Sequence, residues 1–235
     1  MFPEVIVNTP FFGICLTVVV YVFCEALIAR LQLKYCPPML LSALIIILLL
    51  MHYPGLSYAK YQAGAQFIAL LLGPATIALA LPLYRNRGLV KENLGAIASG
   101  IIFGTIFSIV FIFFAGKLLG ASHNVLVSML PKSVTTPIAI EVSKSIGGLP
   151  ALTTAAVVLS GIFGAAFNHK LLKLIGIKDD LVAGLAIGLS SHGLGTSACA
   201  NVSMVQLAIG GVSMGLTGIA TSILAPILLP ILEKL

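Results

Sequence analysis

The sequence has very little charge for its length. Its 235 residues include 13 lysines and arginines and 7 aspartates and glutamates, so that only 9% are charged, whereas 59% are hydrophobic. A soluble globular domain carries roughly 25% charged residues. The composition therefore excludes a soluble enzyme, because too few charges are present to hydrate its surface, and it excludes a disordered chain. The mean hydropathy of +1.13 is typical of an integral membrane protein.

Residue groupings characteristic of three other classes of protein are also missing. The basic residues are scattered between apolar runs and form no stripe with aromatic residues, so we expect no nucleic-acid partner. The 4 cysteines form no Cys-x-x-Cys pair and the 4 histidines lie far apart, so we expect neither a metal nor another cofactor. No acid lies near Ser191 and His192 in the sequence to orient a catalytic histidine, so we do not expect an enzyme.

Eight hydrophobic elements account for most of the chain. They cover residues 11–29, 36–51, 62–83, 94–115, 121–148, 150–167, 181–209 and 212–232. A membrane-spanning helix needs about 20 predominantly apolar residues. We therefore predict an all-α polytopic membrane protein with one membrane domain over residues 1–235, multi-pass in the lipid bilayer of the cell (inner or plasma) membrane. Within the fourth element, Gly95, Gly100 and Gly104 are spaced so that another helix can approach closely.

Three of these elements are interrupted by residues that break helices. Gly73-Pro74 interrupts the third, the run Pro131–Pro137 the fifth, and the run Ser190–Thr196 the seventh. Backbone groups freed by such breaks are tolerated at membrane depth only inside the protein or beside a water-filled cavity. The breaks therefore indicate broken or re-entrant helices around an enclosed polar centre, where half-helix N-termini can bind an anion.

The two halves of the chain resemble each other at three places. Glu25 matches Glu141, the run 38–43 matches 150–155, and the run 73–78 matches 193–198. The matches predict a twofold repeat that pairs residues 8–116 with 122–233, although apolar sequences also match by chance. Interrupted helices in corresponding positions of two repeats are a pointer to a transport site.

The path of segment 121–148 decides how the two repeats are related. If the segment crosses the membrane, the repeats are parallel and the basic loops at 85–91 and 170–178 lie on opposite sides. If the segment is re-entrant, the repeats are inverted and both loops share one side. The positive-inside rule favours a shared side, so we predict an inverted repeat.

The polar cluster of the fifth element is the first candidate for a substrate site. It contains Lys132, Ser133, Thr135, Thr136 and Pro137. The hydroxyl groups and the backbone N–H groups after Pro137 can cradle a carboxylate, and Lys132 can supply positive charge. Glu141 follows one helical turn later and is the candidate for proton coupling, because carboxylates inside a membrane are commonly functional. The alternative is a polar surface loop in which Lys132 and Glu141 are solvated.

Two further clusters are candidate parts of the same site. The seventh element contributes Ser191, His192, Gly193, Gly195 and Thr196, and the third contributes Gly73 and Thr76. Glycine lets the backbone approach a ligand closely, and a histidine can donate to a substrate oxygen or titrate near neutral pH. The alternatives are a structural cap at His192 and an ordinary helix kink at Gly73-Pro74.

Several of these runs resemble the LrgB/CidB family. They are Pro131–Ala139, Gly147–Thr153, Gly161–Gly164, Leu72–Thr76, Ala80–Tyr84, Ser191–Thr196 and Met214–Ile219. The resemblance covers nearly the whole chain and implies one of two functions. The first is an antiholin-like modulator of murein hydrolase export and cell lysis, acting with a small LrgA/CidA-type membrane partner. The second is a carrier of small monocarboxylates such as pyruvate, glycolate or glycerate.

The interrupted helices favour the carrier, because a lysis pore needs no broken helices with convergent hydroxyl groups. We therefore predict a proton- or ion-coupled transporter of the pyruvate, lactate, glycolate or glycerate class. Access to its site would alternate around the broken helices. We also expect the protein to form a homo-oligomer.

Overall fold

The computed structural model describes residues 9, 11–31, 38–53, 55–71, 74, 77 and 80–235. Every element in these ranges is a helix, which confirms the predicted all-α fold. Four helices, α2 (Phe11–Leu31), α8 (Leu94–Leu118), α11 (Pro150–Leu174) and α13 (Met204–Leu232), are long and apolar enough to cross a membrane. The chain is therefore a polytopic membrane protein, and it divides into two compact units, residues 1–75 and 76–235.

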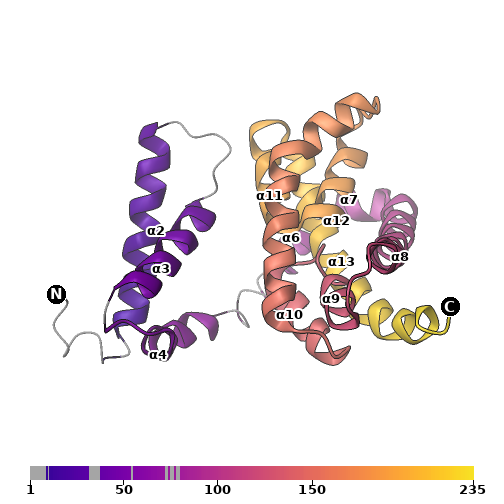
Figure 1. Cartoon of the computed structure of the whole chain (residues 1–235). Coiled ribbons are helices and arrows are strands. Elements are labelled where there is room, and N and C mark those ends of the chain that lie inside the picture. Colours follow the sequence, from indigo (N-terminus) through magenta and orange to yellow (C-terminus); the bar gives the residue numbers. More distant parts are fainter. Residues whose placement is uncertain are drawn as a thin grey trace. The chain divides into compact units, whose positions relative to one another are not determined.

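The first unit is built from α2, α3 (Pro38–His52) and α4 (Tyr58–Ala69) (Figure 1). Proline suits the first turn of a helix, and Pro38 begins α3. The side chain of Ser57 accepts a hydrogen bond from the backbone N–H of Lys60, so α4 starts before the predicted element at 62–83. Gly13 brings α2 close to α4, because a Cβ at this position would overlap the backbone carbonyl of Tyr61.

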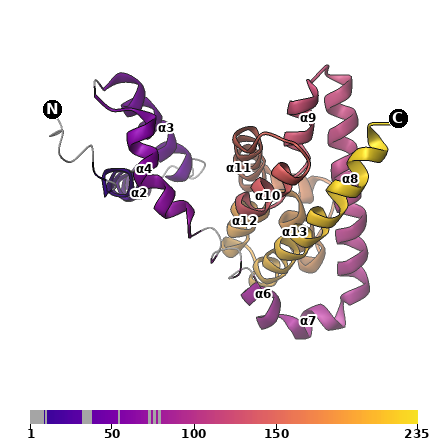
Figure 2. The same ribbon diagram turned by 90° about the horizontal axis from the view of Figure 1, so that it is seen from below.

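The second unit carries the polar sequence clusters. Besides α8, α11 and α13 it contains α6 (Ala80–Arg85), α7 (Arg87–Glu92), α9 (His123–Met129), α10 (Thr136–Ser145), α12 (Asp180–Ala198) and the 3₁₀ helix η1 (Cys199–Asn201). Figure 2 shows α6 and α7 at one end of this unit and α9 with the C-terminus at the other. We name these the α7 end and the α9 end.

A separate apolar cluster holds each end together. At the α7 end, Val90 packs with Ile97 and Ile101 of α8 and with Ile209 and Val212 of α13. At the α9 end, the buried residues are Ile109, Ile112, Phe113, Val127, Leu130, Val142, Ala225, Leu229 and Leu232. Buried Thr105 lies between the residues that α8 contributes to the two clusters, and buried Thr217 lies between those that α13 contributes, so a polar layer separates the clusters.

Segment 121–148 enters from the α9 end and returns to it. The hydroxyl of Ser128 in α9 accepts a hydrogen bond of 2.8 Å from the backbone N–H of Leu149, just before α11. Further along α11, the hydroxyl of Ser160 donates to the carbonyl of Lys132 over 2.8 Å. Because α9 thus runs alongside α11 and residue 149 lies back beside Ser128, α10 must run in the opposite direction. The segment is a re-entrant hairpin, and its helices of 7 and 10 residues are too short to span about 30 Å of hydrocarbon.

A second re-entrant hairpin enters from the α7 end. Helix α12 is kinked at His192, whose backbone angles are φ 41° and ψ −139°, within the predicted break at 190–196. The chain then returns to where α12 began, because Asp180 at its start accepts hydrogen bonds from Ser203 (2.6 Å) and from Gln206 (2.8 Å). The two hairpins, 121–149 and 180–203, therefore approach the middle of the unit from opposite ends.

The predicted boundary between the last two elements was wrong. We expected one element over 181–209 and another over 212–232, whereas α13 begins at Met204. Ser203 causes the difference, because its side chain accepts hydrogen bonds from the backbone N–H groups of Val205 and Gln206 and so caps the new helix. The pair Gly210-Gly211 does not end a helix. Gly210 lies where the side chain of Thr196 leaves no room for a Cβ.

Both basic loops of this unit lie at the α7 end. Segment 85–91, most of which is α7, contributes Val90 to the apolar cluster of this end. His169, directly before segment 170–178, hydrogen bonds to Gln206 at 3.0 Å. The sequence predicted a re-entrant segment 121–148 together with a shared side for the two basic segments, and the second unit has both features. Residues 8–75 belong to the other unit, so the pairing of the two halves as inverted repeats stays a prediction.

Candidate functional site

The tips of the two hairpins meet in the middle of the second unit. The ring Nε2 of His192, at the tip of the α12 hairpin, lies 2.9 Å from the carbonyl oxygen of Val157 in α11. One turn further along α11, Ser160 holds the carbonyl of Lys132 at the tip of the other hairpin. Two of the sequence-predicted clusters, 131–137 and 190–196, are thus brought to neighbouring turns of one helix.

A small enclosed cavity lies between the tips and the long helices α8 and α13. It has a volume of about 10 Å³ and is lined by the hydroxyl-bearing residues Thr105, Ser108, Ser133, Thr217 and Thr221. Its apolar walls come from Ile109, Leu130 and Leu189. A volume of this size holds about one water molecule. The cavity is therefore closed to any larger molecule in this conformation.

Two of the hydroxyl groups that line the cavity are unpaired. Thr105 and Thr217 are each 1% exposed, and their Oγ1 atoms have no hydrogen-bond partner within the described part of the chain. Buried hydroxyl groups are nearly always hydrogen-bonded, and an unpaired one costs about 1–3 kcal/mol. The two threonines thus mark a place where a ligand or water completes the structure.

Lys132 brings a positive charge to the edge of this cavity. Its Nζ donates to the hydroxyl of Ser133 over 3.2 Å, and that hydroxyl lies 3.4 Å from the hydroxyl of Ser108. The two prolines at 131 and 137 shape this break, because neither can donate a backbone hydrogen bond. The sequence alternative was a surface loop with Lys132 and Glu141 solvated. The structure has Glu141 exposed, but Lys132 is half-buried and the neighbouring Ser133 is 6% exposed.

The hydroxyl of Thr135 is unpaired at the start of α10. Thr135 occupies the N-cap position with an extended backbone, yet its side chain makes no capping hydrogen bond. Its Oγ1 is buried without a partner among the described residues. Thr136 and Pro137 form the first turn of the helix and are half-buried. The first N–H groups of a helix have no partner within it, so this N-terminus can bind an anion.

His192 is held in a strained conformation by close packing against α11. Among the described residues it is the one non-glycine residue with positive φ, and it is 5% exposed. A Cβ at Gly161 would lie 2.7 Å from the His192 ring, and one at Gly164 would overlap Ser191. Backbone strain of this kind costs about 1–3 kcal/mol and persists only where the surroundings impose it. The structure therefore uses the His192 ring to anchor the tip of the hairpin.

The residues flanking His192 complete that anchor. The hydroxyl of Ser191 accepts a hydrogen bond from the side chain of Asn168 over 2.9 Å. Gly195 follows on the second half of α12, where a Cβ would lie 2.5 Å from that of Ser191, and Gly193 faces Met214. Thr196 is buried, and its hydroxyl has no partner in the residues that the structure describes.

One other candidate, Glu141, is not brought to this layer. The side chain of Glu141 is 72% exposed and forms a 2.7 Å ion pair with Lys144, one turn along α10. It does not line the cavity. Gly73 and Thr76 lie outside the described residues, so their assignment stays a prediction.

Sequence reasoning missed Thr105, Ser108, Thr217 and Thr221. Thr105 and Ser108 lie three residues apart on α8, and Thr217 and Thr221 lie four apart on α13. Such a spacing places the two hydroxyls of each helix on one face. That spacing was a usable signal. Sequence reasoning also missed Thr153 of α11, which is fully buried and holds the first hairpin. Its hydroxyl lies 2.8 Å from the Ser128 carbonyl and 2.7 Å from the Ser143 hydroxyl.

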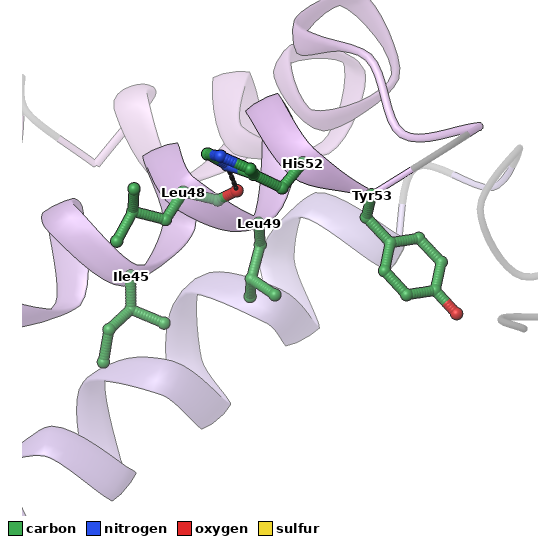
Figure 3. A pocket seen from close by; sticks show the side chains of 5 residues that line it. All are labelled: Ile45, Leu48, Leu49, His52 and Tyr53. Carbon is green, nitrogen blue, oxygen red and sulfur yellow. Dashed lines mark hydrogen bonds between the residues drawn. The ribbon is translucent and has the colours of Figure 1, made fainter.

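Larger pockets occur elsewhere but are apolar. Figure 3 shows one at the end of α3, lined by Ile45, Leu48, Leu49, His52 and Tyr53. The Nδ1 of His52 lies 3.1 Å from the Leu48 carbonyl. Another pocket lies on α8 beside Phe107 and Phe111. Apolar surface of this kind is expected where helices face lipid. Neither pocket offers a charged group to a carboxylate, so we assign the site to the hydroxyl-lined layer.

Gly100 and Gly104 pack α8 against this layer as their spacing predicts. A Cβ on either would lie within 2.7 Å of a leucine side chain of α12, whereas a Cβ on Gly95 would meet no described atom within 4 Å.

Comparison with known proteins then bears on the identity of the chain. No solved structure matches it. The LrgB-like family matches residues 17–231, nearly the whole length. The chain therefore belongs to the LrgB-like family.

Proposed function

We propose that the protein transports small monocarboxylates across the membrane, in the class of pyruvate, lactate, glycolate or glycerate. The supporting observation is the meeting of two re-entrant hairpins from opposite ends at one buried layer of hydroxyl groups. Broken helices around a central polar site are the usual architecture of a secondary transporter. A protein that only perforated or regulated a membrane would have no need for such a layer.

The carboxylate group of the substrate would bind at the tip of the first hairpin. The ammonium group of Lys132 attracts it, and the hydroxyls of Ser133 and Thr135 donate hydrogen bonds to it. The unpaired N–H groups in the first turn of α10 add the partial positive charge of a helix N-terminus. Hydrogen bonds to an ionised group are about twice as strong as those between neutral groups, so these donors suit an anion.

Alternating access would require the two hairpins to leave the layer in turn. The hairpin at the α7 end is held to α11 by His192 with Val157 and by Ser191 with Asn168. The other hairpin is held to α11 by Lys132 with Ser160 and by Ser128 with Thr153. Opening one set of contacts while the other stays closed exposes the site to one side only. We keep Glu141 as a proton-coupling candidate. Its ion pair with Lys144 means that this role would need the carboxylate to change partners during transport.

Uptake of labelled pyruvate, lactate, glycolate and glycerate into proteoliposomes tests this proposal. We expect saturable uptake of at least one of them, and a large loss of uptake in Lys132→Gln. The matched control is Lys173→Gln, which removes an exposed lysine in the last turn of α11 and should leave uptake nearly unchanged. Glu141→Gln should remove the pH dependence of uptake if the coupling assignment holds.

Absence of uptake of all four substrates, with folded protein in the vesicles, would refute the transporter. The antiholin-like function would then become the better account of the family membership. It predicts that expression alters cell lysis whether or not a carboxylate is supplied.

A further inference from the structure

The small cavity between α8, α13 and the hairpin tips has the features of a binding site for one water molecule or one small ion. Its lining hydroxyls come from Thr105, Ser108, Ser133, Thr217 and Thr221, and its volume is about 10 Å³. Such a volume accepts one water molecule or one ion of similar size and excludes a whole carboxylic acid. The identity of its occupant can be argued from the hydroxyl groups that face it.

The hydroxyls of Thr105 and Thr217 are available as donors. Serine and threonine in helices can bond to the carbonyl one turn earlier, as Ser99 of α8 does to Gly95 (2.7 Å) and Ser222 of α13 does to Gly218 (2.8 Å). The two cavity threonines, on the same two helices, make no hydrogen bond within the described part of the chain. Their O–H groups therefore need an acceptor.

The charge beside the cavity decides between a cation and an anion. Lys132 donates to Ser133, whose hydroxyl lines the cavity, so an ammonium group stands one hydrogen bond away from the occupant. A cation would be repelled by that charge and would leave both threonine O–H groups without acceptors. A halide accepts several O–H groups at once and is attracted by the ammonium.

We propose that this cavity binds one chloride ion in the substrate-free protein. Chloride is larger than water but carries no hydrogen atoms, so the unpaired hydroxyls of Thr105 and Thr217 can both donate to it. The proposal rests on the proposed function in one respect, namely that the substrate carboxylate displaces the ion when the hairpins part. Chloride would then stabilise the closed conformation and compete with the substrate.

The test measures halide binding to the purified protein without substrate. The thermal unfolding midpoint is followed in sodium chloride, choline chloride and sodium gluconate at equal ionic strength. We expect a saturable rise with either chloride salt and none with gluconate, because a ligand that binds only the folded state stabilises it. A rise that follows sodium, or no dependence on either ion, would overturn the proposal and leave water as the occupant.

Matched variants locate the ion. Thr217→Val and Thr105→Val remove one donor each without changing size and should weaken chloride binding roughly tenfold or more. Ser222→Ala and Ser99→Ala, on the same helices, should bind chloride as the wild type does. If the valine variants fail to fold, Thr217→Ser retains the donor and should bind, and the chlorine NMR linewidth of the wild type measures binding directly. Chloride binding by all variants alike would refute this site.

The result is separable from the transport proposal. Chloride binding without carboxylate uptake would retain the ion site and reject the transporter. Uptake that is insensitive to chloride, from a protein that binds none, would retain the transporter and reject the ion site.

Discussion

Replacing Gly161 by alanine would test whether His192 anchors the α12 hairpin. The added Cβ would lie 2.7 Å from Cε1 and 3.0 Å from Nε2 of the His192 ring, and 2.8 Å from the Leu194 side chain. The ring cannot retreat without losing its 2.9 Å hydrogen bond to Val157. The anchor would therefore fail even though alanine is the better helix former.

The magnitude follows from these contacts. Overpacking of a close-packed interior costs about 1–3 kcal/mol, and a lost buried hydrogen bond about 0.5–1.5 kcal/mol. The gain in helix propensity from glycine to alanine returns up to about 1 kcal/mol. We expect Gly161→Ala to lower the free energy of unfolding by roughly 0.5–3.5 kcal/mol.

Denaturant unfolding in detergent micelles measures the change, with Gly95→Ala as the control. Gly95 also lies in a long helix, but no described atom stands within 4 Å of the added Cβ, so this variant should be neutral or slightly stabilised. If Gly161→Ala proved as stable as Gly95→Ala, the packing of His192 against α11 would not constrain the hairpin. The anchoring role would then be refuted.

Two further predictions concern the α7 end. Single cysteines at Arg87 and Lys173 should be labelled from the same side of the membrane, and one at Lys144 from the opposite side; labelling of Arg87 and Lys173 from different sides would refute the re-entrant path of 121–148. Hydrogen bonds from the side chains of Ser203 and Gln206 hold the pKa of Asp180, which lies outside the four spanning helices, below its usual value. A carboxyl whose pKa is depressed stabilises the fold above its unfolded pKa, and this contribution is lost as the pH falls through the folded pKa. The wild type should therefore lose more stability on acidification than Asp180→Asn does, and equal losses would contradict the assignment.

Breaks in the helices could be predicted from the sequence because they depend on local backbone chemistry. Proline lacks a donor and disfavours helix before it, which locates the break between α9 and α10. The break at His192 was predicted from the glycines and hydroxyls around it, although the strained residue is the histidine and not a glycine. The boundary at Ser203 was missed because a capping serine resembles any other serine until its side chain is seen to face the helix N-terminus.

The direction in which a polar side chain points could not be predicted. Glu141 and Ser133 belong to one sequence cluster, yet the first is largely exposed and the second lines the cavity. The helix face on which a residue lies is periodic, but which face meets another helix depends on how distant segments pack. The spacing of hydroxyl residues indicates a polar face on α8 and on α13, but only the packing of these two remote helices places Thr105 and Thr217 around one space.

The sequence by itself determined that the protein is an all-α membrane protein with broken helices, because composition and hydrophobic length decide whether a chain can be dissolved in lipid. Only the tertiary structure decided that both described breaks are the tips of re-entrant hairpins from opposite ends. It also decided that they meet beside a cavity about the size of one water molecule. The reason is that a hairpin and a crossing have the same local sequence pattern and differ only in contacts between residues far apart in the chain, such as Ser128 with Leu149 and Asp180 with Ser203.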